Sequence, residues 1–487
     1  MLSAHFASRD SLMKIGLWFA LIAILLAAGS AHADSLTLTP RVDPRVELLS
    51  IVSRLAGYQE YSNCVIPRYV ADIDSAFAPY KNHPAIEYAR GLRTHRQVAY
   101  DAVMSLAIHL SPPPELKPLV PFTDSIPDPR FNADNAENFT NLLRDFYRDA
   151  HFAAFFEAHR DLYSISQTRF EAVTARMDFN WFKAYYGTMP VGTFHVIIGL
   201  NNGHGNYGPK LTLPDGREEP YAIIGCGQTD SLGLPDFTDE WLSLLVHEFT
   251  HSFVNPVVDK HYASFESAAE KVFAPVADQL RESAYGSAST MVCESLVRAG
   301  VILFMRDHGT DSAATRWSTI YQQLIGFVWM DALCDTLSAY HRQRDHYPTF
   351  DSYMPVIAAF YTALSADTAG MMHRFEGRLG HVTAIEPFDN KSQTVDPTCT
   401  RITLHFDRPM HGDTLRDGDG GKDHNPAVGR PAYLDGGKTL VIPVSLKPDW
   451  DYSFALSGQV FKTAEDYPLR RYVVEFKTSP ASGSSAH

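Results

Sequence analysis

The chain has 487 residues, of which 45% are hydrophobic and 20% are charged, and its formal net charge at pH 7 is −14. Fractions of this size are typical of soluble globular proteins, and the length predicts two or three domains. The acidic balance argues against nucleic acid or an anionic membrane surface as the main partner, because both need basic patches.

The N-terminus has the layout of a secretory signal peptide. Lys14 precedes an apolar run over residues 15–28, and small residues follow up to Ala31-His32-Ala33. A basic residue, an apolar stretch and an A-x-A site predict cleavage after Ala33. An uncleaved membrane anchor would need about 20 apolar residues, more than this run contains. We therefore expect a signal peptide at 1–33, a periplasmic or secreted bacterial protein, and no stable membrane insertion after cleavage.

The next part of the chain combines helical periodicity with two strand-like runs. Apolar residues recur at helical spacing in three stretches, 46–110, 138–175 and 239–369. Two shorter runs have the composition of strands, 193–200 and 221–226. A turn-rich segment, 201–208, lies between them. The sequence therefore predicts an α+β fold, in which helices surround a small sheet.

The C-terminal part has a different pattern. Five short β-prone runs are separated by Gly, Asp and Pro, at 382–385, 401–406, 439–444, 452–456 and 472–476. This pattern is typical of a β-sandwich, and Gly380 is the expected boundary. We therefore expect a mostly helical region at 34–379, an all-β sandwich at 380–478 and a flexible tail at 479–487.

The segment 238–253 carries the pattern that points to chemistry. We expect one helix, capped by Thr238 and stopped by Asn255-Pro256. His247 and His251 lie four residues apart, so both imidazoles project from one face and can hold one cation. Glu248 is placed beside a metal-bound water without being a ligand, where its carboxylate can take the proton of that water. The apolar residues around the motif predict that the helix is buried, and this argues against two surface histidines.

A catalytic zinc site needs a third protein ligand, and three residues are candidates. Glu294 is a lone acid in a nearly continuous apolar helix, where a carboxylate without a cation is rare, although an ion pair with Arg298 is the alternative interpretation. Glu270 has the spacing of one aminopeptidase group, but its charged neighbours suggest a solvated face. His261 lacks the glycine that metzincins place before it. We expect Glu294, with Glu270 left open.

Two further roles are predicted less directly. A developing oxyanion needs a donor, and Tyr285 is our candidate, with Tyr207 and Tyr340 as alternatives. Zinc peptidases commonly bind the substrate backbone along a strand that precedes the metal helix. The segments 223–226 and 201–208 are the candidates for that strand.

Three stretches resemble a family of uncharacterised exported bacterial proteins, grouped as a domain of unknown function with an H-E-x-x-H motif. They are 100–106 (YDAVMSL), 247–256 (HEFTHSFVNP) and 294–299 (ESLVRA). The resemblance spans most of residues 45–375 and implies that Glu294 is the third ligand of a gluzincin-like site. Gluzincins usually carry this Glu much nearer the second His and after an Asn, whereas Cys293 precedes it here.

The C-terminal region resembles a bacterial Ig-like domain. The stretches that match its strands are 402–410 (ITLHFDRPM), 434–440 (LDGGKTL) and 474–478 (VEFKT). Such modules usually act as spacers or adhesion units, so the resemblance implies no catalytic role.

Together these features lead us to expect a zincin-like zinc metallopeptidase that acts on a peptide or protein substrate and not on nucleic acid. Zn²⁺ would be held by His247, His251 and Glu294, with Glu248 as general base. Two alternatives remain open, a metal-stabilised binding or adhesion module without catalysis, and a zinc hydrolase of a non-peptide amide or ester. Neither the oligomeric state nor the substrate is predicted.

Overall fold

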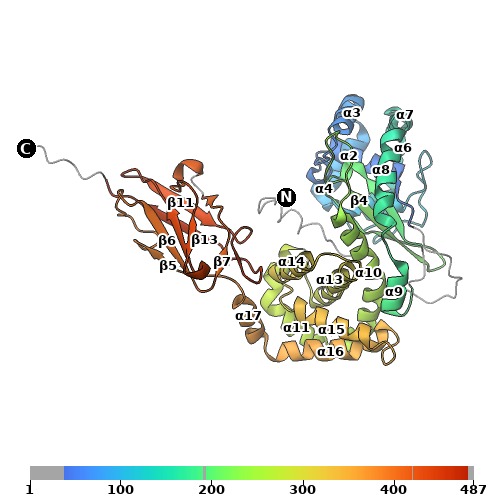
Figure 1. The fold of residues 1–487 in the computed structure, drawn as a ribbon. Coiled ribbons are helices and arrows are strands. Elements are labelled where there is room, and N and C mark those ends of the chain that lie inside the picture. Colours follow the sequence, from blue (N-terminus) through green and yellow to red (C-terminus); the bar gives the residue numbers. More distant parts are fainter. Residues whose placement is uncertain (1–37, 190–192, 284, 419–420, 481–487) are drawn as a thin grey trace, which may run out of the picture. The chain divides into compact units, whose positions relative to one another are not determined.

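The computed structural model describes residues 38–189, 193–283, 285–418 and 421–480. The expected signal peptide lies outside these residues, as does most of the expected tail. The described chain divides into two compact units, one up to Ala366 and the other from Asp367. Figure 1 gives the helices and strands of each unit.

The first half of the larger unit is mainly helical, as the periodicity of 46–110 and 138–175 predicts. Three of its helices have a proline in the first turn, where the missing N–H has no partner to lose. The helices are α2 (Pro44–Leu55), α3 (Pro67–Phe77), α4 (Pro84–Arg96), α5 (Asp101–Ile108), α6 (Ala133–Asp149), α7 (Phe152–Ala158), α8 (Arg160–Thr174) and α9 (Phe179–Tyr186).

A small sheet lies among these helices, and both predicted strand runs belong to it. The strands are β1 (Arg41–Val42), β2 (His195–Gly199), β3 (Lys210–Thr212) and β4 (Glu218–Gly225), in the order β1-β2-β4-β3. β1, β2 and β4 are parallel, whereas β3 is antiparallel to β4. The bridge between Tyr207 and Ile223 continues the β3 pairing. β4 is therefore paired on both sides up to Ile223, so the candidate substrate strand 223–226 has no free edge at that residue.

Helices return after the sheet, as predicted. They are α10 (Asp239–His261), α11 (Glu266–Phe273), α12 (Ala277–Glu282), α13 (Ala288–Asp307), α14 (Ser312–Leu324), α15 (Met330–Arg342) and α16 (Phe350–Ala366). The expected α+β arrangement of this unit is confirmed.

The ends of α10 differ from the prediction. Pro256 lies inside the helix and does not stop it. The buried side chains of Val254 and Val258, both 0% exposed, pack on either side of Pro256, and this packing outweighs the lost backbone hydrogen bond. At the other end Thr238 occupies the cap position, but its hydroxyl makes no capping hydrogen bond.

Helix α13 is the buried centre of this half of the unit, and it packs against α10, α11, α14 and α15. By length and composition alone α13 is apolar enough to cross a membrane, but 72% of the 18-residue stretch that meets this criterion is buried inside the protein. Because the core helix of a globular unit meets the same criterion, this composition follows from burial on all sides.

The C-terminal unit begins with α17 (Thr368–Glu376) and continues as antiparallel sheets. One sheet has the order β5 (Val382–Glu386), β6 (Arg401–Phe406), β10 (Thr439–Pro443) and β9 (Ala432–Leu434). A second has β13 (Tyr472–Lys477), β11 (Asp451–Leu456) and β8 (Arg416–Asp417), and β7 (Met410–His411) pairs with β12 (Lys462–Thr463). Each of the five predicted β-prone runs matches one of these strands to within one residue at either end. Both larger sheets contribute to one apolar core. Likeness to an Ig-like domain remains an expectation.

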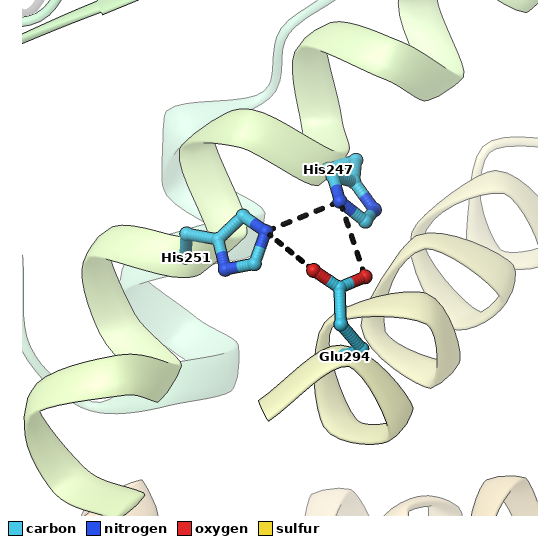
Figure 2. A group of neighbouring side chains, drawn as sticks. All are labelled: His247, His251 and Glu294. Carbon is cyan, nitrogen blue, oxygen red and sulfur yellow. Dashed lines mark hydrogen bonds and ion pairs between the residues drawn. The ribbon is translucent and has the colours of Figure 1, made fainter. Parts of the chain in front are cut away.

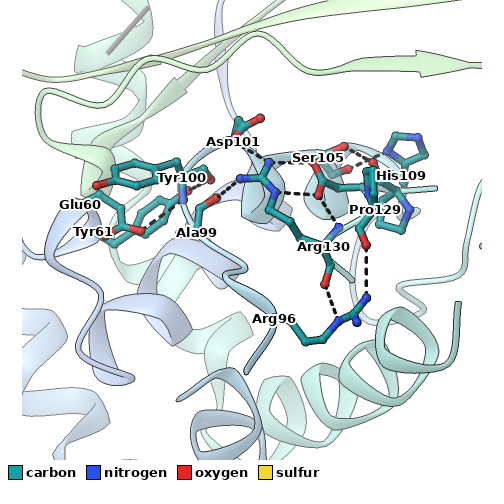
Figure 3. Close-up of polar contacts among 12 residues, drawn as sticks. Glu60, Tyr61, Arg96, Ala99, Tyr100, Asp101, Ser105, His109, Pro129 and Arg130 are labelled. Atoms are coloured by element: carbon teal, nitrogen blue, oxygen red, sulfur yellow. Dashed lines mark hydrogen bonds and ion pairs between the residues drawn. The ribbon is translucent and has the colours of Figure 1, made fainter. Parts of the chain in front are cut away.

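A polar network holds the start of α5 in an unusual backbone conformation (Figure 3). Tyr100 has a φ of 53° and a ψ of −125°, which is rare for a residue with a side chain. The hydroxyl of Tyr61 donates to the Tyr100 carbonyl at 2.7 Å, and Glu60 accepts from the Tyr100 N–H at 3.2 Å. Arg130 donates to Asp101 at 2.8 Å and thereby ties the following turn to the segment before α6.

Glu47 joins α2 to the end of the sheet from a fully buried position. Its two carboxylate oxygens accept from the Leu200 N–H and from the Tyr69 hydroxyl, each at 2.7 Å. The Tyr69 hydroxyl also lies 2.9 Å from that of Tyr163. Burial raises the pKa of Glu47 from 4.5 to about 7, although these hydrogen bonds lower it.

We expect Glu47→Gln to remove a pH dependence from the stability. The folded chain keeps a proton that the unfolded chain loses above pH 4.5, so this stabilisation is complete below pH 4.5 and is lost as the pH rises through about 7. The loss in the free energy of unfolding is about 3 kcal/mol. Urea unfolding between pH 4 and 8 measures it, with the exposed Glu270→Gln as control. If the free energy of unfolding changed equally with pH in the native chain and in both variants, the assignment would be contradicted.

Candidate metal centre

His247 and His251 lie on one face of α10, as their spacing predicts. Their side chains are 6% and 5% exposed, and their Nε2 atoms are 3.1 Å apart (Figure 2). The opposite face of the helix is held by aromatic packing, in which the Phe249 ring lies 4.8 Å from that of Phe182 and 5.4 Å from that of Phe194. The motif helix is therefore buried on both sides, and the two imidazoles project toward α13.

Glu294 reaches the two histidines from α13. Its Oε2 lies 3.7 Å from Nε2 of His247, and its Oε1 lies 3.5 Å from Nε2 of His251. The side chain is 5% exposed. One ligand atom from each of the three residues lies within 4.8 Å of the others, a spacing that suits a metal ion. The structure thus brings together the three residues that the sequence predicts as ligands.

The contact between His251 and Asn255 favours the tautomer of His251 whose inward nitrogen carries a lone pair. Its Nδ1 lies 3.1 Å from Oδ1 of Asn255, which can only accept, so Nδ1 carries the hydrogen. The Nε2 of a neutral ring then has no hydrogen and faces a carboxylate oxygen of Glu294. Two electron-rich atoms at 3.5 Å repel each other unless a cation or a proton lies between them.

The electrostatic surroundings favour a neutral His247. Burial lowers its pKa well below the usual value, and the nearby His251 and Arg298 lower it further. A neutral imidazole is the form that binds metals. Two imidazoles and one carboxylate are also a common protein ligand set of catalytic zinc sites, so the residues present fit a zinc ion.

Glu248 follows His247 and is partly buried. Burial raises its pKa to about 7, and the negative charge of Glu294 adds to this effect, while His251 and Arg298 oppose it. A carboxyl group with a pKa near the working pH is suited to general base catalysis.

Arg298 and Tyr285 lie against Glu294. The Nε–H of Arg298 donates to Oε2 of Glu294 at 3.2 Å, so the ion pair considered as an alternative to a metal ligand is present together with the two histidines. Arg298 also donates to the Tyr285 hydroxyl. Tyr285 is 0% exposed; it also interacts with Glu294, and its ring lies 6.0 Å from that of Phe327. Its role as an oxyanion donor stays a prediction.

The other candidates lie outside the group formed by the two histidines and Glu294. Glu270 is exposed on α11. His261 lies 2.8 Å from Asp351. Tyr340 accepts a hydrogen bond from Arg344.

Sequence reasoning missed the part of Asn255, which it treated only as a helix stop. The available signal was its position four residues after His251, which places it on the same face of a continuing helix. Sequence reasoning also missed Gln322 of α14, whose Oε1 accepts from Arg298 at 2.8 Å. No local sequence pattern predicts this contact between α13 and α14.

The chain belongs to the family described as "Domain of unknown function (DUF4932)", which matches residues 38–360. This confirms the family resemblance in its coarse form, and the description assigns no activity. A comparison with curated proteins gave no match.

Three solved structures of surface-layer proteins align with the chain. "Structure of surface layer protein SbsC, domains 1-6" has 12% identity over 49% of this chain and 33% of that chain, with a TM-score of 0.18. "Crystal structure of the N-terminal part of the bacterial S-layer protein SbsC" has 12% identity over 49% and 58%, with a TM-score of 0.16. The chain thus spans 33% and 58% of their lengths, and scores this low do not establish a shared fold.

We expect the purified protein to hold about one zinc per chain, and His251→Ala and Glu294→Gln to lose it. Plasma mass spectrometry of the native chain and of each variant measures the zinc content. Glu270→Gln is the matched control and should keep its zinc, because Glu270 is exposed outside the group. A native chain without zinc after reconstitution, or loss in the control with retention in Glu294→Gln, would contradict the assignment.

Proposed function

We propose that this chain is an exported, zincin-like zinc metallopeptidase. His247, His251 and Glu294 would hold Zn²⁺, and Glu248 would be the general base. The observation that carries the proposal is the buried convergence of two imidazoles and one carboxylate, with a second carboxyl group next to one ligand. Export rests on the sequence before Asp34, where a signal peptide is expected.

The roles of the residues follow from their positions. A bound zinc ion would polarise the substrate carbonyl and make water more acidic. His247, His251 and Glu294 hold their donor atoms in a buried site, which strengthens electrostatic interactions by excluding solvent. Glu248, with its raised pKa, accepts the proton of the attacking water and can return it to the leaving amine.

The open edge of β3 supports a peptide substrate. Tyr207 and Ile223 exchange backbone hydrogen bonds of 2.9 and 2.8 Å, and the N–H of Tyr221 donates to Pro209 at 3.0 Å. In an antiparallel pair only every second residue bonds to the neighbouring strand, and the residues between them turn their N–H and C=O groups to the other side. Lys210 follows the bonded Pro209, so its N–H and C=O point away from β4, and β3 is the last strand of the sheet. An extended peptide can pair with such an edge.

The same strand lies near the helices that carry the motif and Glu294. Burial raises the pKa of Asp259 on α10, and the positive charge of Lys210 partly offsets this rise. Asp259 in turn raises the pKa of Cys293, which precedes Glu294 and is affected mainly by burial. These charge effects place Lys210 near the C-terminal part of α10, so a peptide bound along 207–212 would run toward the helix that carries the motif.

Glu248→Gln tests catalysis separately from metal binding. We expect near-native zinc content and at least a ~100-fold lower rate on a peptide that the native chain cleaves, because the amide cannot accept the proton. Initial rates on a peptide from a library screen measure the effect, with Glu270→Gln as control. Full turnover by Glu248→Gln would refute the general base. A zinc-loaded native chain that cleaves no peptide would favour the binding module or a non-peptide substrate.

Lys210→Pro tests the substrate strand. Proline removes one outward N–H and is tolerated at a sheet edge, so we expect kcat/KM on peptides to fall about 5- to 10-fold. Lys210→Ala is the matched control, since it removes the ion pair with Glu218 (2.7 Å) but keeps the N–H. Equal kcat/KM values for the two variants would argue against backbone pairing at this residue.

A further inference from the structure

The two oxygens of the Glu294 carboxylate have different surroundings. Oε2 accepts the Nε–H of Arg298 at 3.2 Å. Oε2 also lies 3.7 Å from Nε2 of His247, whereas Oε1 lies 3.5 Å from Nε2 of His251. A hydrogen bond from a guanidinium reduces the electron density of the oxygen that accepts it. Oε1 is therefore the stronger donor toward a cation between the imidazoles.

The guanidinium of Arg298 is itself fixed in place. The side chain is 5% exposed. Besides Glu294, it donates to Gln322 at 2.8 Å and to the Tyr285 hydroxyl, and it lies 5.3 Å from the centre of the Phe327 ring. Burial raises the pKa of Tyr285 well above its usual value, so the phenol keeps its hydrogen. Tyr285 and Gln322 thus hold the two terminal nitrogens of the guanidinium, and this fixes the direction in which its Nε–H meets Oε2 of Glu294.

We propose that Arg298 is a positioning residue of the metal centre, which engages Oε2 of Glu294 so that the carboxylate binds the cation through Oε1 alone. A carboxylate that binds through one oxygen takes one coordination position, and three protein ligands then leave a fourth position for water or substrate. A carboxylate released from Arg298 could turn and bind through both oxygens, which would fill that position. This inference rests on the proposed zinc site.

The same ion pair prepares the site before the cation arrives. A buried carboxylate without a positive partner is strongly destabilising. Because Arg298 supplies that charge from the next turn of the same helix, it holds the Glu294 carboxyl group in place in the metal-free chain. The cation therefore enters a formed site, and the fold does not depend on it.

Arg298→Met is the main test, with Arg298→Lys as the conservative variant. Arg306→Met is the matched control on the same helix, because Arg306 contacts Ser338 and Asp307 and lies outside the site. We expect Arg298→Met to bind zinc ~10- to 100-fold more weakly in a competition titration with a chelator, as is typical when the partner of a metal ligand is removed. Arg298→Lys should recover part of the affinity, since it keeps the charge but loses the fork.

Replacing zinc with Co²⁺ gives a visible absorption spectrum, which would not change if Arg298 had only a structural role. The visible absorption of Co²⁺ is strong with four ligands and weaker with five or six. We expect the native chain and Arg306→Met to give the strong spectrum and Arg298→Met to give the weaker one. Thermal unfolding of the metal-free proteins should show Arg298→Met destabilised, with the loss largely recovered in the double variant Glu294→Gln/Arg298→Met.

The outcomes separate this inference from the proposed function. Native zinc affinity and a native cobalt spectrum in Arg298→Met would overturn the role of Arg298, even if the native chain cleaves peptides. A native chain that binds zinc but cleaves no peptide would overturn the proposed function and leave the role of Arg298 intact. If Arg298→Met does not fold, the affinity and the spectrum of Arg298→Lys decide, and native values in that variant would also overturn the role.

Discussion

The arrangement of the larger unit depends on one buried charge, the carboxylate of Glu294. A carboxylate that is 5% exposed costs several kcal/mol unless positive or hydrogen-bonding partners surround it. Arg298 supplies a positive partner from α13 itself, and the two histidines of α10 close the other side. The interface between these helices is therefore specified by polar contacts at its centre, although both helices are largely apolar.

The rest of the unit keeps α10 in register with that charge. Phe249 and Phe253 lie on the face away from the histidines and pack on Phe182 at ring distances of 4.8 and 5.5 Å. The sheet is held by a second buried carboxyl group, Glu47, which links α2 to the residue after β2. Each buried acid thus joins elements that are distant in the sequence. Rotation of α10 would unpack its aromatic face and separate His247 from Glu294, so the ligand geometry is coupled to the core.

Short-range patterns predicted what depends on neighbours along the chain. The spacing of the two histidines follows from the helical period of 3.6 residues. The strands β2 and β4 and the C-terminal strands follow from the strand period of 2. Glu294 was predictable because a lone acid in an apolar helix needs a partner. The passage of α10 through Pro256 and the double pairing of β4 were not, because tertiary packing and the β3 hairpin decide them. Gln322 lies on another helix, and no period in the sequence connects it with Arg298.

The donor set also restricts which cation the centre can hold. Ca²⁺ and Mg²⁺ prefer oxygen ligands in larger numbers, so a site with two imidazole nitrogens and one carboxylate selects a first-row transition metal. Affinity alone favours Cu²⁺ over Zn²⁺ in such a site, so the occupant in the cell depends on supply and geometry. Hydrolysis needs a cation that polarises a carbonyl without redox chemistry and tolerates four ligands. Zn²⁺ meets both conditions.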